Sequence, residues 1–145
     1  MKIELFEGVQ DFFKSAGENA CYAFCIIKIA ERATGMVMNP YTALFEGIKS
    51  GYIGYNTANP ADPDNFYIYD PAAFFRKLTG FPVSVFKETD LNYQPKEREF
   101  IVQCWERKTT GRIITHFRLP DWDSLADSQT VKYGEVASLR VFKVG

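Results

Sequence analysis

The sequence predicts an α+β fold, with helices first and an antiparallel sheet afterwards. Apolar residues recur at helical spacing up to about Gly80, whereas from Pro82 onward they alternate with polar residues or form β-branched runs. Helices followed by consecutive strands are typical of a sheet that is covered on one side by helices. With 145 residues, of which 46% are apolar, the chain can close one sizeable core but is short for two. We therefore expect a single domain over residues 1–145.

Four helices are expected before the sheet begins. Residues 20–34 are apolar nearly all round and end at Gly35, so they should form the central buried helix. Asn39 and Asp70 each precede a proline, a pattern in which the polar residue caps the helix and proline takes its first position. Gly17 is expected to end the first helix. The expected helices cover residues 3–17, 20–34, 40–50 and 71–80.

The second half of the chain reads as strands. Two of the runs are separated by "KTTGR", a short connection that contains glycine, as a hairpin requires. The expected strands cover residues 83–85, 98–107, 112–119 and 135–144. This order would let a residue at the start of the buried helix face a residue carried by the sheet.

Charge and cysteine count narrow the functional classes. A net charge of −1 gives no electrostatic reason to expect nucleic acid or an anionic membrane surface, so peptidic or small partners are favoured. No segment has transmembrane length, and acidic residues interrupt the apolar start where a signal peptide would be continuous. Three cysteines cannot form a closed set of disulfides, which favours reduced thiols and a cytoplasmic location.

Cys21 is the candidate nucleophile. It opens the central helix, and a helix N-terminus favours the thiolate form of a cysteine. The expected loop of Gly17, Glu18 and Asn19 before it would permit close approach of a substrate carbonyl, and the backbone N–H of Cys21 could donate to an oxyanion. Cys25 and Cys104 are expected to be buried core residues.

The chain has a single histidine, His116, which is therefore the candidate general base. Three aspartates follow it in "LPDWDSLAD" and are candidates to orient its imidazole. Asp121 follows Pro120 at a turn, and Asp127 has the context of a turn or cap residue. Asp123 lies between Trp122 and Leu125, where the chain should pack back onto the sheet, so it is the preferred partner.

These segments resemble the papain-like cysteine peptidases. "NACYAF" is similar to the segment in which a cysteine, an aromatic residue, alanine and phenylalanine open the central helix of that family. "THFRLPDWDSL" resembles the histidine and aspartate segment of the compact bacteriocin-leader-processing peptidases, and small uncharacterised domains related to them share the likeness. The resemblance implies a papain-like fold, a peptide or small amide substrate and no cofactor. It assigns Cys21 as nucleophile, His116 as base and Asp123 as the orienting carboxylate.

One position departs from the family pattern. The glutamine that usually lies six residues before the cysteine, as an oxyanion donor, is Ser15 here. Asn19 and Gln10 are the candidates to replace it.

Two alternatives remain open. Cys21, Cys25, Cys104 and His116 are the ligand types that zinc prefers, although their spacing is unlike that of structural zinc sites. A non-catalytic binding module is the stronger rival, because aromatic residues in "GYIGYN" and "NFYIYD" could line a groove.

Overall fold

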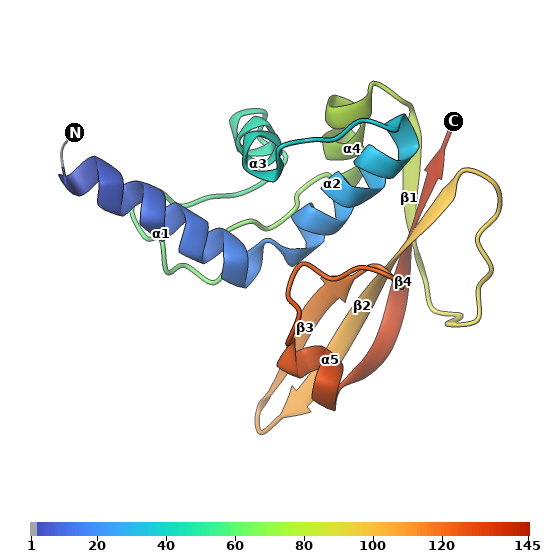
Figure 1. Cartoon of the computed structure of the whole chain (residues 1–145). Coiled ribbons are helices and arrows are strands. Elements are labelled where there is room, and N and C mark those ends of the chain that lie inside the picture. The colour runs from blue at the N-terminus through green and yellow to red at the C-terminus, as the bar shows by residue number, and fades with distance from the viewer. Residues whose placement is uncertain (1–2) are drawn as a thin grey trace.

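The structure of the chain, a computed structural model, describes the backbone of residues 3–145 and the side chains from Asp11 onward. The helices of the first 80 residues are grouped on one side of a sheet, and a short helix from the second half lies at the lower end of the sheet (Figure 1). The elements in chain order are α1 (Ile3–Asn19), α2 (Cys21–Thr34), α3 (Pro40–Lys49), α4 (Pro71–Thr79), β1 (Val83–Glu88), β2 (Glu99–Thr109), β3 (Arg112–Arg118), α5 (Gln129–Tyr133) and β4 (Glu135–Val144).

The sheet has four strands in the order β1-β4-β2-β3, and every neighbouring pair is antiparallel. This confirms the predicted α+β class and the antiparallel sheet. A tight hairpin joins β2 to β3, and Gly111 adopts the positive φ of 81° that its turn requires. The last strand of the chain, β4, therefore lies inside the sheet between β1 and β2, while β1 and β3 form its edges.

The central helix α2 is buried between the other helices and the sheet. It contacts α1, α3 and α4 on one side and the edge strand β3 on the other. Its buried face supplies Ile26 and Ile29, which join Phe74 of α4 and Phe142 of β4 in the core. This packing fixes the start of α2 next to β3.

Side-chain caps explain where α3 and α4 begin. The Asn39 side chain accepts hydrogen bonds from two backbone N–H groups of α3, and the Asp70 side chain accepts one from Ala73 in α4. Both helices have proline at or beside the first helical position, as predicted. Within the described residues, no helix is long and apolar enough to cross a bilayer.

Two sequence expectations were wrong. Gly17 does not end the first helix: α1 continues to Asn19, and the interruption falls at Ala20. Glu18 and Asn19 are therefore the last turn of a helix and not a loop. The short helix α5 was not expected; its N-cap is Ser128, whose hydroxyl accepts a hydrogen bond of 3.3 Å from the Val131 N–H.

Candidate active site

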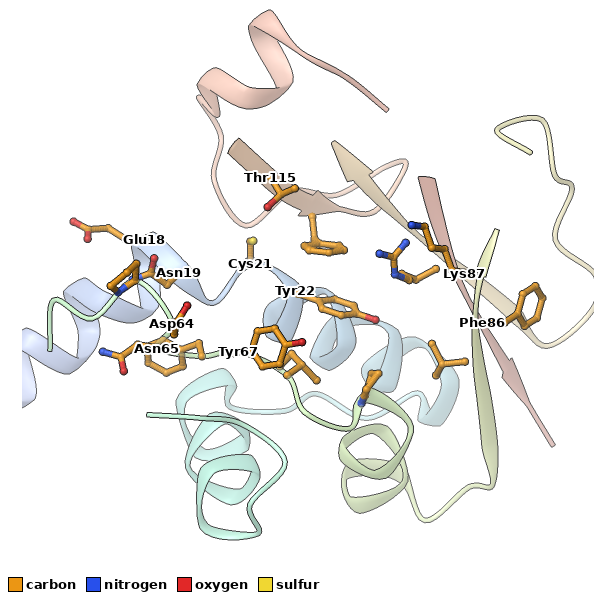
Figure 2. A pocket seen from close by; sticks show the side chains of 17 residues that line it. Glu18, Asn19, Cys21, Tyr22, Asp64, Asn65, Tyr67, Phe86, Lys87 and Thr115 are labelled. Atoms are coloured by element: carbon orange, nitrogen blue, oxygen red, sulfur yellow. The ribbon is translucent and has the colours of Figure 1, made fainter. Parts of the chain in front are cut away.

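Cys21 is the first residue of α2, is partly exposed, and lines a cleft (Figure 2). The Ala20 N–H still donates to the Ala16 carbonyl over 2.9 Å, but among the described residues the N–H groups of Cys21 and Tyr22 that follow it have no partner in α1. Ala20 has no side-chain cap to offer them. The start of α2 therefore presents backbone donors for negative charge beside the sulfur.

His116, on the edge strand β3, is held by a short polar contact. Its Nε2 donates to Asp123 Oδ1 over 2.8 Å, and the two side chains are only 8% and 11% exposed. Because Asp123 holds Nε2, Nδ1 is the ring nitrogen that remains for a second partner. The arrangement fixes the ring orientation and leaves one nitrogen available for proton exchange.

The electrostatics of His116 reflect both neighbours. Burial lowers the pKa of the imidazole, whereas hydrogen bonding to Cys21, the charge of Cys21 and the contact with Asp123 raise it. The raising effects are larger, so the pKa of His116 lies above its usual value. The structure thus brings Cys21, His116 and Asp123 together, although they come from the start of a helix, a strand and a loop.

A tight turn positions Asp123. The N–H of Leu119 donates to the carbonyl of Trp122 over 2.8 Å, which folds the chain back immediately after β3. The Leu125 N–H donates to Asp123 Oδ1 over 3.0 Å, and Arg118 Nη1 lies 3.8 Å from Oδ2. These contacts hold the carboxylate against the ring with little freedom to turn away.

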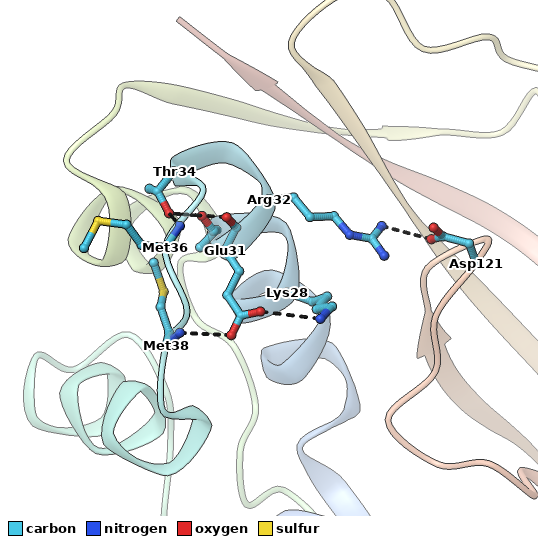
Figure 3. Close-up of polar contacts among 8 residues, drawn as sticks. Lys28, Glu31, Arg32, Thr34, Met36, Met38 and Asp121 are labelled. Carbon is cyan, nitrogen blue, oxygen red and sulfur yellow. Dashed lines mark hydrogen bonds and ion pairs between the residues drawn. The ribbon is translucent and has the colours of Figure 1, made fainter.

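The other two aspartates lie elsewhere. Asp121 is 68% exposed and accepts a hydrogen bond of 2.9 Å from Arg32, as Figure 3 shows. That hydrogen bond lowers the pKa of Asp121. Asp127 is exposed, and the cap of α5 is the next residue, Ser128. Asp123 is therefore the aspartate of this segment that contacts His116.

The remaining cysteines are core residues, as predicted. Cys25 and Cys104 are both buried, and burial is the main cause that raises the pKa of each thiol. In the described part of the chain, no group of three or more His, Cys, Asp or Glu side chains is placed to hold a metal ion. The four residues of the zinc alternative do not form such a group.

The cleft beside Cys21 has a volume of about 600 Å³. Asn19, at the end of α1, lines the same cleft as Cys21 and is the oxyanion candidate found there. Ser15, in the family's glutamine position, is 3% exposed and does not line the cleft, and its hydroxyl has no hydrogen-bond partner in the described part of the chain. The side chain of Gln10 lies outside the described residues.

The cleft also has walls that sequence reasoning missed. Residues 66–68 form part of one wall, so one of the aromatic segments considered for a binding groove does line it. Lys87 of β1 and Arg140 of β4 line the opposite part. Only the strand register brings these two cations together, so no local sequence signal could have shown it.

Comparisons with protein-family models, with curated proteins and with solved structures found no match for this chain.

Proposed function

We propose that the chain is a thiol-dependent peptidase or amidase that uses a papain-like arrangement of Cys21, His116 and Asp123. The observation that carries the proposal is the position of His116. Its Nε2 is bonded to the partly buried carboxylate of Asp123, and its pKa is raised in part by the Cys21 sulfur. A base held between an orienting acid and a partly exposed thiol is the arrangement that nucleophilic catalysis by cysteine requires.

The reaction follows from this geometry. His116 accepts the thiol proton, and Cys21 Sγ forms a bond to the carbonyl carbon of the substrate. The backbone N–H of Cys21 stabilises the oxyanion of the tetrahedral intermediate, and the Asn19 side chain, which lines the same cleft, is the candidate second donor. The C–N bond then breaks, His116 gives its proton to the leaving amine, and a thioester remains on Cys21.

Water completes the cycle. His116 takes a proton from the water molecule that attacks the thioester, the C–S bond breaks, and the acid product leaves as the proton returns to Cys21. Asp123 stabilises the imidazolium at both stages and keeps the ring in place. A cytoplasmic location with reduced thiols belongs to the same proposal.

The test is the alkylation of Cys21 by limiting iodoacetamide between pH 5.5 and 8.5, followed by peptide mass spectrometry. Exposure alone would favour Cys21 over the two buried cysteines, so the decisive comparison is between wild type and His116→Asn. We expect the variant to lose at least about tenfold in the Cys21 alkylation rate at pH 6, because the imidazolium no longer stabilises the thiolate. Cys104→Ser is the matched control and should leave the rate unchanged. Equal rates in wild type and His116→Asn would contradict the proposal.

Binding without cleavage is the second candidate. Two observations favour it: Ser15 supplies no oxyanion donor to the cleft, and the apolar and aromatic segment 66–68 lines it. In that case a Cys21→Ser variant would retain both peptide affinity and biological effect. If Cys21→Ser retains affinity but loses the effect, catalysis is favoured instead.

A further inference from the structure

Lys87 and Arg140 form an unusual pair of like charges on the wall of the cleft. They are directly opposite one another in the antiparallel register of β1 and β4, and both line the cleft. Like charges in this relation destabilise a sheet. Neither forms an ion pair with a carboxylate of the described side chains. The fold thus holds two cations together without a neutralising partner among those side chains.

Arg140 is also fixed in position. Its Nη1 donates to Ser138 Oγ over 2.9 Å and to the Leu139 carbonyl over 3.3 Å. Its guanidinium lies 5.8 Å from the centre of the Phe117 ring. Among the described residues, Nε and Nη2 have no acceptor, so they remain available to a ligand. A positioned guanidinium with free donors is suited to a carboxylate.

Two stacked rings connect this pair to the reacting groups. The ring of Phe117, which follows His116 in β3, stacks on that of Tyr22, which follows Cys21 in α2, at a centroid distance of 4.3 Å. The Arg140 guanidinium is near the same Phe117 ring, 5.8 Å from its centre. A peptide that follows this wall of the cleft from Cys21 would therefore bring an acidic group to the two cations.

The other side of the cleft has the opposite charge. Glu18 and Asp64 line it, and Figure 2 shows both on the side of Cys21 away from Lys87. Cys21 therefore lies between an acidic and a basic part of the same cleft. A substrate would be oriented along the cleft by its own charges.

We infer that the cleft selects a peptide or amide that carries a carboxylate near the scissile bond, bound by Lys87 and Arg140. The inference rests on the proposed function, because it assigns a substrate class to the same site. The carboxylate could be an acidic side chain or the C-terminus of the peptide. Both present the same chemistry to the two cations.

The test is a binding assay that needs no turnover. Fluorescent alanine-based hexapeptide amides with one glutamate at each position in turn are titrated into Cys21→Ser protein and followed by anisotropy. The all-alanine amide is the reference, and the all-alanine free acid separates a terminal carboxylate from a side chain. We expect the best acidic peptide to bind at least about tenfold more tightly than the reference, as charge-assisted hydrogen bonds do. The advantage should shrink with added salt.

Substitutions of Lys87 and Arg140 test whether these two cations cause the preference for acidic peptides. Lys87→Gln and Arg140→Gln should each remove most of the preference for acidic peptides. Lys143→Gln is the matched control, because Lys143 is an exposed cation of β4 three residues from Arg140 and therefore on the opposite face of the sheet. Lys87 is exposed, so its variant should fold normally even if Arg140→Gln does not. Lys87→Glu should reduce the preference further.

The outcomes separate the two proposals. Equal binding of acidic and neutral peptides, or a preference that survives both glutamine substitutions, would overturn the inference whatever the alkylation experiment shows. A preference that depends on Lys87 and Arg140 supports the inference as a carboxylate site. If His116→Asn then leaves alkylation of Cys21 unchanged, the catalytic proposal alone is overturned.

Discussion

The contact between His116 and Asp123 gives a prediction that can be measured directly, because the chain has one histidine. Its imidazole proton resonances in an NMR titration therefore belong to His116 alone. Asp123→Asn keeps the shape of the side chain and removes its negative charge. We expect the substitution to lower the pKa of His116, since the Asp123 contact is among the causes that raise it. Cys21→Ser should lower it as well.

The magnitude follows from the geometry. At 2.8 Å between two side chains that are 8% and 11% exposed, the contact is a buried charge-assisted hydrogen bond, which contributes about 1.5–3 kcal/mol. The pKa of His116 is raised when folded, so this stability is fully present below the unfolded value of about 6.5. It is lost as the pH rises through the folded value. The deficit of Asp123→Asn in unfolding free energy should therefore be larger at pH 5.5 than at pH 9.

Urea denaturation of wild type and Asp123→Asn at the two pH values measures this deficit. Asp121→Asn is the matched control, because Asp121 is exposed and contacts Arg32. Exposed ion pairs contribute about 0–1 kcal/mol, so its deficit should be small at both pH values. A deficit of Asp123→Asn that is equal at pH 5.5 and pH 9, with an unchanged histidine titration, would refute the reasoning.

Two further predictions follow from the structure. If hydrolysis is detected, Asp123→Asn should reduce kcat/KM for a peptide far more than Asp121→Asn does. The loss could reach the ~10⁴-fold that neutralising the triad carboxylate causes in a serine protease, and equal small losses in both variants would contradict this. Gly134→Ala should destabilise the fold by about 3 kcal/mol in urea denaturation, because its Cβ would overlap backbone oxygens of β2 and α5. Gly17 lies inside α1, where an added Cβ would meet no neighbouring atom within 4 Å, so Gly17→Ala should instead stabilise the fold by about 0.5–1 kcal/mol. If Gly134→Ala proved more stable than Gly17→Ala, the packing around Gly134 would be wrongly described.

The features that the sequence predicted well are those set by neighbouring residues. The caps at Asn39 and Asp70 and the alternation along residues 135–144 depend on local hydrogen bonds and on the twofold period of a strand. The turn that packs Asp123 against His116 could also be predicted, because the two residues are only seven positions apart in the sequence.

The features that escaped prediction depend on contacts between distant segments. The pairing of Lys87 with Arg140 follows from the insertion of the last strand between β1 and β2. The helix α5 is five residues long, too short for a recognisable apolar period, and its cap is a single serine. The predicted end of α1 was wrong because Gly17 is a residue that commonly ends a helix, whereas α1 continues to Asn19 and the break falls at Ala20.

That alanine has a consequence for the order of events during synthesis. Alanine has the highest helix propensity, so Ala20 itself does not favour a break, and the junction between α1 and α2 is packed into the core through the fully buried residues Ala16, Ala20 and Ala23. Before that core forms, nothing fixes the shape of the junction, and the N–H of Cys21 is free to bond to the preceding turn. His116 is also translated long after Cys21. Under the proposed function, a nascent chain would therefore carry an unactivated thiol until β3 has packed against the start of α2.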